Sequence, residues 1–255
     1  MQFMINLSLL AASGGWWDKV KADFALNFIQ ASRWKLIVSG LGVTVKVTLL
    51  AMVLGLVLGV VVAAVRSSYD LQKDEAKKNK ASWVILSIFN VICKIYLTVI
   101  RGTPVVIQLL IIYFIIFADS DNGVMIASLA FGINSGAYVA EIFRSGIMSI
   151  DKGQMEAGRS LGFNYMQTMR YIIIPQAFKN VLPALANEFI ALLKETSVSG
   201  YVAIQDLTRA GNIIRAKTYS AYMPLIGVAV IYLAMVMALT AGVSRLERRL
   251  RNSDH

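Results

Sequence analysis

Charged side chains inside otherwise apolar segments are the residues of this sequence best placed to do chemistry. Glu188 and Glu195 lie seven positions apart in one such segment, with Asn187 and Lys194 directly before them. Seven residues are about two helical turns, so the two carboxylates share a face. Ionisable groups in a membrane usually face the bundle interior or water. We therefore expect this face to line a translocation path, with Glu195 meeting an amino or cationic group; a helix-packing network is the alternative.

A second pair of opposite charges lies in another apolar segment. Glu141 and Arg144 are three positions apart, which places them on one helix face, where they can pair. A structural ion pair at the end of that segment and a role in transport both remain open.

Several kinds of chemistry are excluded by residue counts and spacing. The single histidine, His255, and the single cysteine, Cys93, do not support a His/Cys metal site, a disulfide or a Ser-His-Asp triad, so we expect no metal or cofactor on this chain. The stretch Gly153–Ser160 approaches the spacing of a phosphate-binding loop. Arg159 stands where that loop needs lysine, and the preceding segment is apolar helix rather than strand.

The composition indicates a membrane protein. Its helices must therefore hold the charged side chains described above within hydrocarbon. Of the 255 residues, 57% are apolar and 16% are charged, and mean hydropathy is +0.62. The net charge of +10 fits basic loops beside membrane spans and anionic lipid better than nucleic acid, because no basic patch interleaves with aromatics on a soluble surface.

The sequence contains five apolar segments, each about as long as a membrane span or longer, and so predicts five transmembrane helices. A single helix over 83–117 would be ~52 Å long, well beyond a ~30 Å hydrocarbon core, so we expect a break at Arg101–Pro104. Gly55 and Gly59 form a small-residue face suited to close helix contact. The segments are approximately 36–65, 83–117, 124–147, 182–204 and 222–243.

The distribution of basic residues predicts the orientation. The loops 66–82 and 144–180 and the tail together carry fourteen Lys and Arg, and the opposite side carries seven. The positive-inside rule then puts the C-terminus in the cytoplasm. Five spans put the N-terminus outside, where 1–35 is expected to be an extracytoplasmic segment without a cleaved signal peptide. Residues 247–255 are the expected cytoplasmic tail.

The cytoplasmic loop 149–180 is the most informative stretch. It predicts a short helix over Gly153–Leu161, ended by Gly162 at the position favoured for a C-cap. A second periodic stretch begins at Tyr165 and is interrupted by Pro175. A helix–turn–helix on the membrane face has the right shape to insert into a groove of a soluble partner.

Glu156-Ala157-Gly158, followed by Leu161-Gly162 and later Pro175-Gln176-Ala177, resembles the EAA loop of ABC importer permeases. In that family the third position is usually Ala. The polar amino acid permeases of the histidine/glutamine/arginine type are similar at further positions: Arg101-Gly102-Thr103-Pro104 with Gln108, Ala137-Tyr138 with Glu141 and Arg144, and Lys194-Glu195-Thr196-Ser197. The resemblance covers roughly 40–246. It departs in the charged insertion 70–82, which we expect only to be a solvated extension.

The resemblance implies an all-α ABC type I importer permease fold over 36–246, with a coupling helix that docks on a cytoplasmic ATPase. The expected coupling residues are Glu156, Ala157, Gly158, Arg159, Leu161 and Gly162; the expected substrate-path residues are Glu195, Glu188, Asn187, Glu141 and Gln108. ATP and magnesium would be bound by the separate ATPase.

The remaining partners and the location also follow from the resemblance. We expect an extracytoplasmic amino-acid-binding protein, a second permease copy or a similar permease, and membrane lipid in a bacterial inner membrane. The acidic groups of the apolar segments favour a cationic amino acid as the substrate, with glutamine or cystine still open.

Two other classes of protein remain as alternatives. A secondary transporter would show internal repeats and more helices, neither of which we see. A membrane scaffold could recruit a soluble partner through the same loop.

Overall fold

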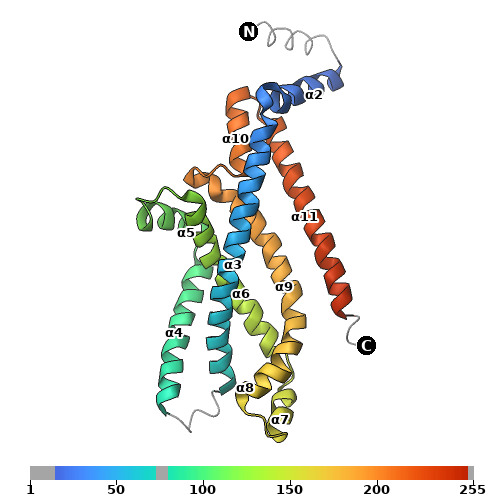
Figure 1. The fold of residues 1–255 in the computed structure, drawn as a ribbon. Helices are drawn as coiled ribbons and strands as arrows, with labels where there is room; N and C mark the ends of the chain where they lie inside the picture. The colour runs from blue at the N-terminus through green and yellow to red at the C-terminus, as the bar shows by residue number, and fades with distance from the viewer. Residues whose placement is uncertain (1–14, 73–79, 252–255) are drawn as a thin grey trace. The chain divides into compact units, whose positions relative to one another are not determined.

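The computed structural model describes residues 15–72 and 80–251, and every element in these ranges is helical (Figure 1). The expectations for 1–14, for 252–255 and for most of the charged insertion fall outside the described residues. The longer helices are α2 Trp16–Phe24, α3 Trp34–Gln72, α4 Lys80–Gly102, α5 Val105–Ile111, α6 Gly123–Met148, α7 Lys152–Ser160, α9 Ile174–Glu195, α10 Leu207–Thr218 and α11 Tyr222–Arg251. Short helical segments are η1 Ala25–Ile29, η2 Gln30–Ser32, η4 Ile112–Ile116, α8 Tyr165–Thr168, η5 Met169–Ile173 and η6 Thr196–Val202.

Four of the described helices, α3, α4, α6 and α11, are long and apolar enough to cross a membrane. The expected all-α integral membrane class is therefore confirmed. The helix α9 is not among the four, and charged residues such as Lys179, Glu188 and Lys194 interrupt its apolar sequence. Five spans thus remain a prediction that depends on α9.

The predicted break in the second apolar segment is present. Helix α4 ends at Gly102, and Pro104 is the N-cap of α5 with an extended backbone. A proline disfavours helix in the residue before it and is tolerated at a helix start, where its missing N–H has no partner to lose. The second half of the predicted segment is correspondingly short, with α5 and η4 together covering 105–116.

The described residues form two compact units, the first comprising 15–46 together with 197–237. Its core gathers Ile37, Leu207, Ala210, Ile214 and Val228. Asp206 is fully buried at the N-cap of α10, where its carboxylate accepts from the Arg209 backbone N–H at 2.8 Å. Burial raises the pKa of Asp206 to about 6. The sequence analysis left 205–220 outside the five predicted spans and predicted no helix there, so it missed this one.

The second unit comprises 47–72, 80–196 and 238–251. Here α6 packs on α3, α4 and α9. The predicted small-residue face of α3 makes the close contact expected of it. A Cβ at Gly59 would lie 2.5 Å from the Val139 side chain and 2.9 Å from the backbone nitrogen of Ala140, so only glycine lets the two helices approach this closely.

Candidate functional site

The predicted short helix of the 149–180 loop is present as α7, and both of its ends are capped. The Asp151 carboxylate accepts from the Gly153 N–H at 2.7 Å. At the other end Gly162 has φ +85, and the N–H groups of Gly162 and Phe163 donate to the carbonyls of Arg159 and Gly158. This pair of bonds is a Schellman motif, and the positive φ is the reason that the chain needs glycine there.

Gly158 fixes α7 against the segment that follows it. A Cβ at this position would lie 2.6 Å from the Thr168 methyl carbon and 2.9 Å from its hydroxyl. Thr168 is fully buried and its hydroxyl donates to the Asn164 carbonyl. The departure from alanine at the third position of the Glu-Ala-Gly motif therefore coincides with tight packing between α7 and α8.

The outer side of α7 and the turn after it expose apolar and acidic groups. Glu156 and Ala157 are exposed, and Leu161 and Met166 are 75% and 68% exposed. Exposed large apolar side chains next to charged ones are typical of a surface that binds another protein. Arg159 is half-buried, so the predicted coupling residues are divided between an outward and an inward side.

Exposed Glu156 and the inward-facing residues of α7 together border a cavity of about 280 Å³. Glu156, Met155 and Arg159 contribute to it from α7, and Asp70 contributes from the end of α3. The lining also includes Ile147 near the end of α6. The helix thus borders, through this cavity, the ends of α3 and α6.

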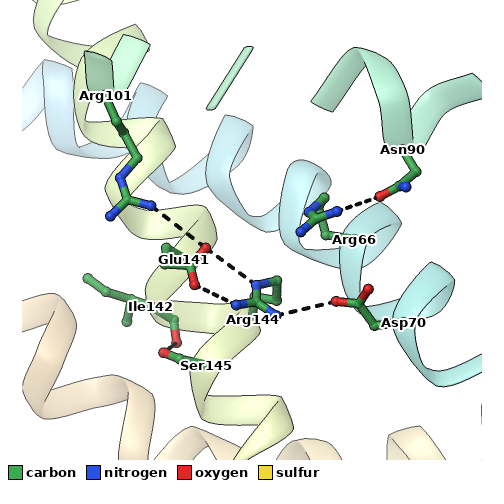
Figure 2. Close-up of polar contacts among 8 residues, drawn as sticks. All are labelled: Arg66, Asp70, Asn90, Arg101, Glu141, Ile142, Arg144 and Ser145. Carbon is green, nitrogen blue, oxygen red and sulfur yellow. Dashed lines mark hydrogen bonds and ion pairs between the residues drawn. The ribbon is translucent and has the colours of Figure 1, made fainter. Parts of the chain in front are cut away.

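A cluster of ion pairs joins α3, α4 and α6 (Figure 2). Arg144 donates to both carboxylate oxygens of Glu141, with its Nη2 2.7 Å from Oε1, and its Nη1 lies 3.3 Å from Asp70 Oδ2. Arg101 Nη1 lies 3.9 Å from Glu141 Oε2. The predicted pairing of Glu141 with Arg144 is therefore present, and the Glu141 carboxylate is shared by two arginines.

One of the two acids of α9, Glu188, contacts α6. Ser135 of α6 donates from its hydroxyl to Glu188 Oε1 at 2.8 Å, and Glu188 is half-buried. Glu195, two turns later, is also half-buried, whereas Asn187 and Lys194 are exposed. The four polar residues of this segment therefore divide: the two acids are partly enclosed and their neighbours lie on the outside.

Gln108 lies at the helix break. Its side-chain nitrogen donates to the Ile100 carbonyl at 2.7 Å, and to the carbonyl and hydroxyl of Thr103 at 3.0 and 2.8 Å. Its oxygen accepts from the Asn134 amide at 3.0 Å. The predicted path residue thus satisfies backbone groups that the break leaves without helical partners.

Sequence reasoning missed the partners that hold these groups. Ser135 and Asn134 are buried polar residues of α6. Arg66 of α3 donates to the Asn90 side chain of α4 at 2.8 Å, and Asp70 was assigned to a solvated insertion. Polar residues inside apolar segments were the available signal, because a buried polar group needs a hydrogen-bond partner.

Relatives of known function share most of the chain. The chain is 39% identical over 186 residues to the arginine transport system permease protein ArtQ of Bacillus subtilis, covering 67% of this chain and 85% of that protein. It is 40% identical over 168 residues to the glutamine transport system permease protein GlnP of Escherichia coli, covering 64% and 77%.

Solved structures agree with this similarity. The crystal structure of an amino acid ABC transporter with histidines matches with a TM-score of 0.73 at 40% identity, covering 84% of this chain and 94% of that one. An inward-facing structure of the MetNI methionine ABC transporter matches with a TM-score of 0.70, covering 87% and 99%. At 19% identity, the second match supports the fold alone.

The type I ABC importer permease fold expected from the resemblance is therefore confirmed. The profile of the family described as "Binding-protein-dependent transport system inner membrane component" matches residues 84–252, about two thirds of the chain. The chain belongs to this family of ABC transporter permeases.

Proposed function

We propose that the chain is the translocation subunit of an ATP-driven importer of polar amino acids, with cationic amino acids as its preferred substrates. The similarity to arginine and glutamine permeases supports the amino acid class. ATP would be hydrolysed by a separate cytoplasmic ATPase that binds α7. An extracytoplasmic binding protein would deliver the substrate, and a second copy of the chain would complete the path.

The exposed, doubly capped helix α7 carries this proposal. Leu161 and Glu156 offer a partner one exposed apolar and one exposed acidic group on α7 and the turn after it. Gly158 packs α7 against Thr168 and so against the segment leading into α9. A push on α7 would therefore move α9, and rigid-body motion of packed helices is the usual means of alternating access.

Charge reversal at Glu156 tests the coupling. The full transporter, with its ATPase and binding protein, is reconstituted in liposomes, and uptake and ATP hydrolysis are measured together. We expect Glu156→Lys to abolish substrate-stimulated hydrolysis. Ser160→Ala, an exposed position on the same helix whose hydroxyl donates to the Glu156 carbonyl within that helix, serves as the control. Full stimulation in Glu156→Lys would refute the role of α7, as would impermeant labelling of α7 from the cell exterior.

The two half-buried acids of α9 are proposed to meet the substrate. Glu188 and Glu195 present carboxylates at the enclosed side of α9, where they could bind an ammonium or guanidinium group. Asn187 would add a polar contact at the exposed edge of the path. Glu141 and Gln108 would border the same path while holding α4 and α5 in place.

Neutralisation of one acid tests this path. We expect Glu195→Gln to lower arginine uptake at least tenfold and glutamine uptake less, with the amount of associated ATPase unchanged. Asp121→Asn removes a carboxylate from an exposed turn and is the matched control. Equal arginine uptake by Glu195→Gln and the unaltered protein would overturn the assignment.

A further inference from the structure

Helix α2 has an apolar face that the rest of the first unit leaves largely uncovered. Trp16, Val20 and Phe24 recur at intervals of four residues and Trp17 lies beside them, so the four share one face of the helix. Trp16, Trp17 and Phe24 are 68%, 67% and 50% exposed, and none of the nine residues of this fully described helix is buried. A cluster of large apolar side chains on a surface marks a site of interaction.

The remaining positions of α2 carry charges of both signs. They are Asp18, Lys19, Lys21 and Asp23, and all four are exposed. A helix with tryptophans on one face and lysines elsewhere is typical of helices that lie in the plane of a membrane surface, with the apolar face ~5–10 Å deep at the boundary of headgroups and acyl chains. Lys19 and Lys21 can reach lipid phosphates from that depth, because their stems are apolar and only their ends are charged.

Two polar side chains fix the segment that follows α2. Asn27 of η1 is fully buried. Its amide nitrogen donates to the Asp23 carbonyl at 2.8 Å, and its oxygen accepts from the Thr218 hydroxyl at 2.7 Å. Arg33 donates to the Leu26 carbonyl across the turn formed by η2. All of these residues belong to the first unit, so η1 is held both to the end of α10 and to the residue before α3.

Two spanning helices begin beside this segment. Helix α3 begins at Trp34 and α11 at Tyr222, which are 50% and 82% exposed. Exposed tryptophan and tyrosine at the ends of spans are typical of the membrane surface. Phe28 of η1 packs on α11, because a Cβ at Gly227 would lie 2.7 Å from its ring. Gly227 is five residues, or ~7.5 Å, beyond the start of α11, a depth at which interfacial helices are found.

We propose that α2 is an interfacial helix, whose face of Trp16, Trp17, Val20 and Phe24 inserts among the headgroups and upper acyl chains of membrane phospholipids. The bilayer is favoured over a soluble protein as the occupant of this face, because the starts of α3 and α11 bring lipid to the same level whether or not a partner is bound. Only the assignment to the extracytoplasmic leaflet rests on the predicted orientation.

Spin labelling tests the insertion on the full-length chain. In a Cys93→Ala background, a nitroxide is attached at Phe24→Cys on the apolar face, or at Asp18→Cys among the charged positions as the matched control. The chain is reconstituted in bilayers of phosphatidylethanolamine and phosphatidylglycerol, and collisions of the label with dissolved oxygen and with a water-soluble nickel chelate are measured. We expect the ratio of oxygen to nickel accessibility to be severalfold higher at Phe24→Cys than at Asp18→Cys.

A second pair of variants tests whether the tryptophans cause the insertion. Replacing both Trp16 and Trp17 by glutamine should lower the ratio at Phe24→Cys severalfold, because the face loses its two largest side chains. The same replacement at Trp83, in the second unit, should leave the ratio unchanged. All of these positions lie on helix surfaces or are only half-buried, so the fold tolerates the changes.

Three results would overturn the proposal. Equal ratios at Phe24→Cys and Asp18→Cys, with high nickel accessibility at both, would mean that the face lies in water. Low accessibility of the Phe24→Cys label to both reagents would mean that protein covers it, either another part of the chain or a second copy. An unchanged ratio in the Trp16 and Trp17 double variant would remove the tryptophan face as the cause. The labels are read without ATP or substrate, so a failed importer assignment would leave these results unaffected.

Discussion

Replacing Gly158 by alanine is the sharpest perturbation that the structure offers. The added methyl would sit 2.6 Å from the Thr168 methyl carbon, 2.9 Å from its hydroxyl and 3.1 Å from the end of Ile172. Ile172 can turn aside. Thr168 cannot do so easily, because it is fully buried and its hydroxyl is bonded to the Asn164 carbonyl.

Two opposing effects set the magnitude. Overpacking a close contact destabilises by roughly 1–3 kcal/mol. Alanine stabilises a helix interior relative to glycine by about 1 kcal/mol. The net expectation is a destabilisation of about 1 kcal/mol for the docking of α7 on α8, which corresponds to a roughly fivefold rise in the undocked population.

Amide hydrogen exchange measures this population directly. We expect peptides covering 157–168 to exchange about fivefold faster in Gly158→Ala, with peptides of α6 unchanged, because opening of α7 is local. In a Thr168→Ala background the added methyl has room, so Gly158→Ala should then slow exchange instead. Slower exchange in the single variant would refute the packing argument.

Three further perturbations follow from the same contacts. Gly59→Ala should lower the thermal midpoint of the purified protein sharply, since its Cβ would meet the Ala140 backbone at 2.9 Å, whereas Gly42→Ala, with no atom of another element within 4 Å, should raise it slightly because alanine favours the helix. Arg144→Ala should destabilise by roughly 1–3 kcal/mol, because it leaves two carboxylates without their main partner, and should lower the same midpoint more than Arg101→Ala, whose ion pair is longer and more exposed. The raised pKa of Asp206 means that the native state binds an extra proton between about pH 4 and 6; stability should therefore fall as pH rises through this window, and Asp206→Asn should flatten the thermal midpoint across it while keeping the N-cap.

Local breaks in the fold could be predicted because single residues dictate them. Pro104 ends one helix and begins another, and Gly162 provides the left-handed turn after α7. Both effects depend on backbone sterics alone, so the surrounding structure does not alter them.

The starts of two helices were not predicted in the same way. Helix α9 begins at Ile174, eight residues before the predicted span, because Pro175 in the first turn needs no N–H partner. Helix α10 was missed although Asp206 is a good N-cap, because a polar stretch was taken to be loop. Both helix starts carry a local signal, but the prediction placed helices by hydropathy and gave these signals too little weight.

The candidate site shows a contrast between features set within one helix and features set by contacts between helices. The pairing of Glu141 with Arg144 was predictable, since it depends on spacing within one helix. The inclusion of Asp70 and the bond from Ser135 to Glu188 were not, since they join residues that are 74 and 53 positions apart. Without a register between helices, a sequence shows which polar groups need partners but not which partners they find.

The side chain of Gln108 has a mechanical consequence for the bent segment α4–α5. A proline break without hydrogen bonds across it would bend freely. Here the side-chain amide of Gln108, a residue of α5, donates to the Ile100 carbonyl of α4 and to the Thr103 carbonyl at the break. The segment therefore behaves as a rigid elbow. Spectroscopic labels placed on its two arms should keep a constant separation while the rest of the transporter cycles, which makes the elbow a natural internal ruler for motions elsewhere.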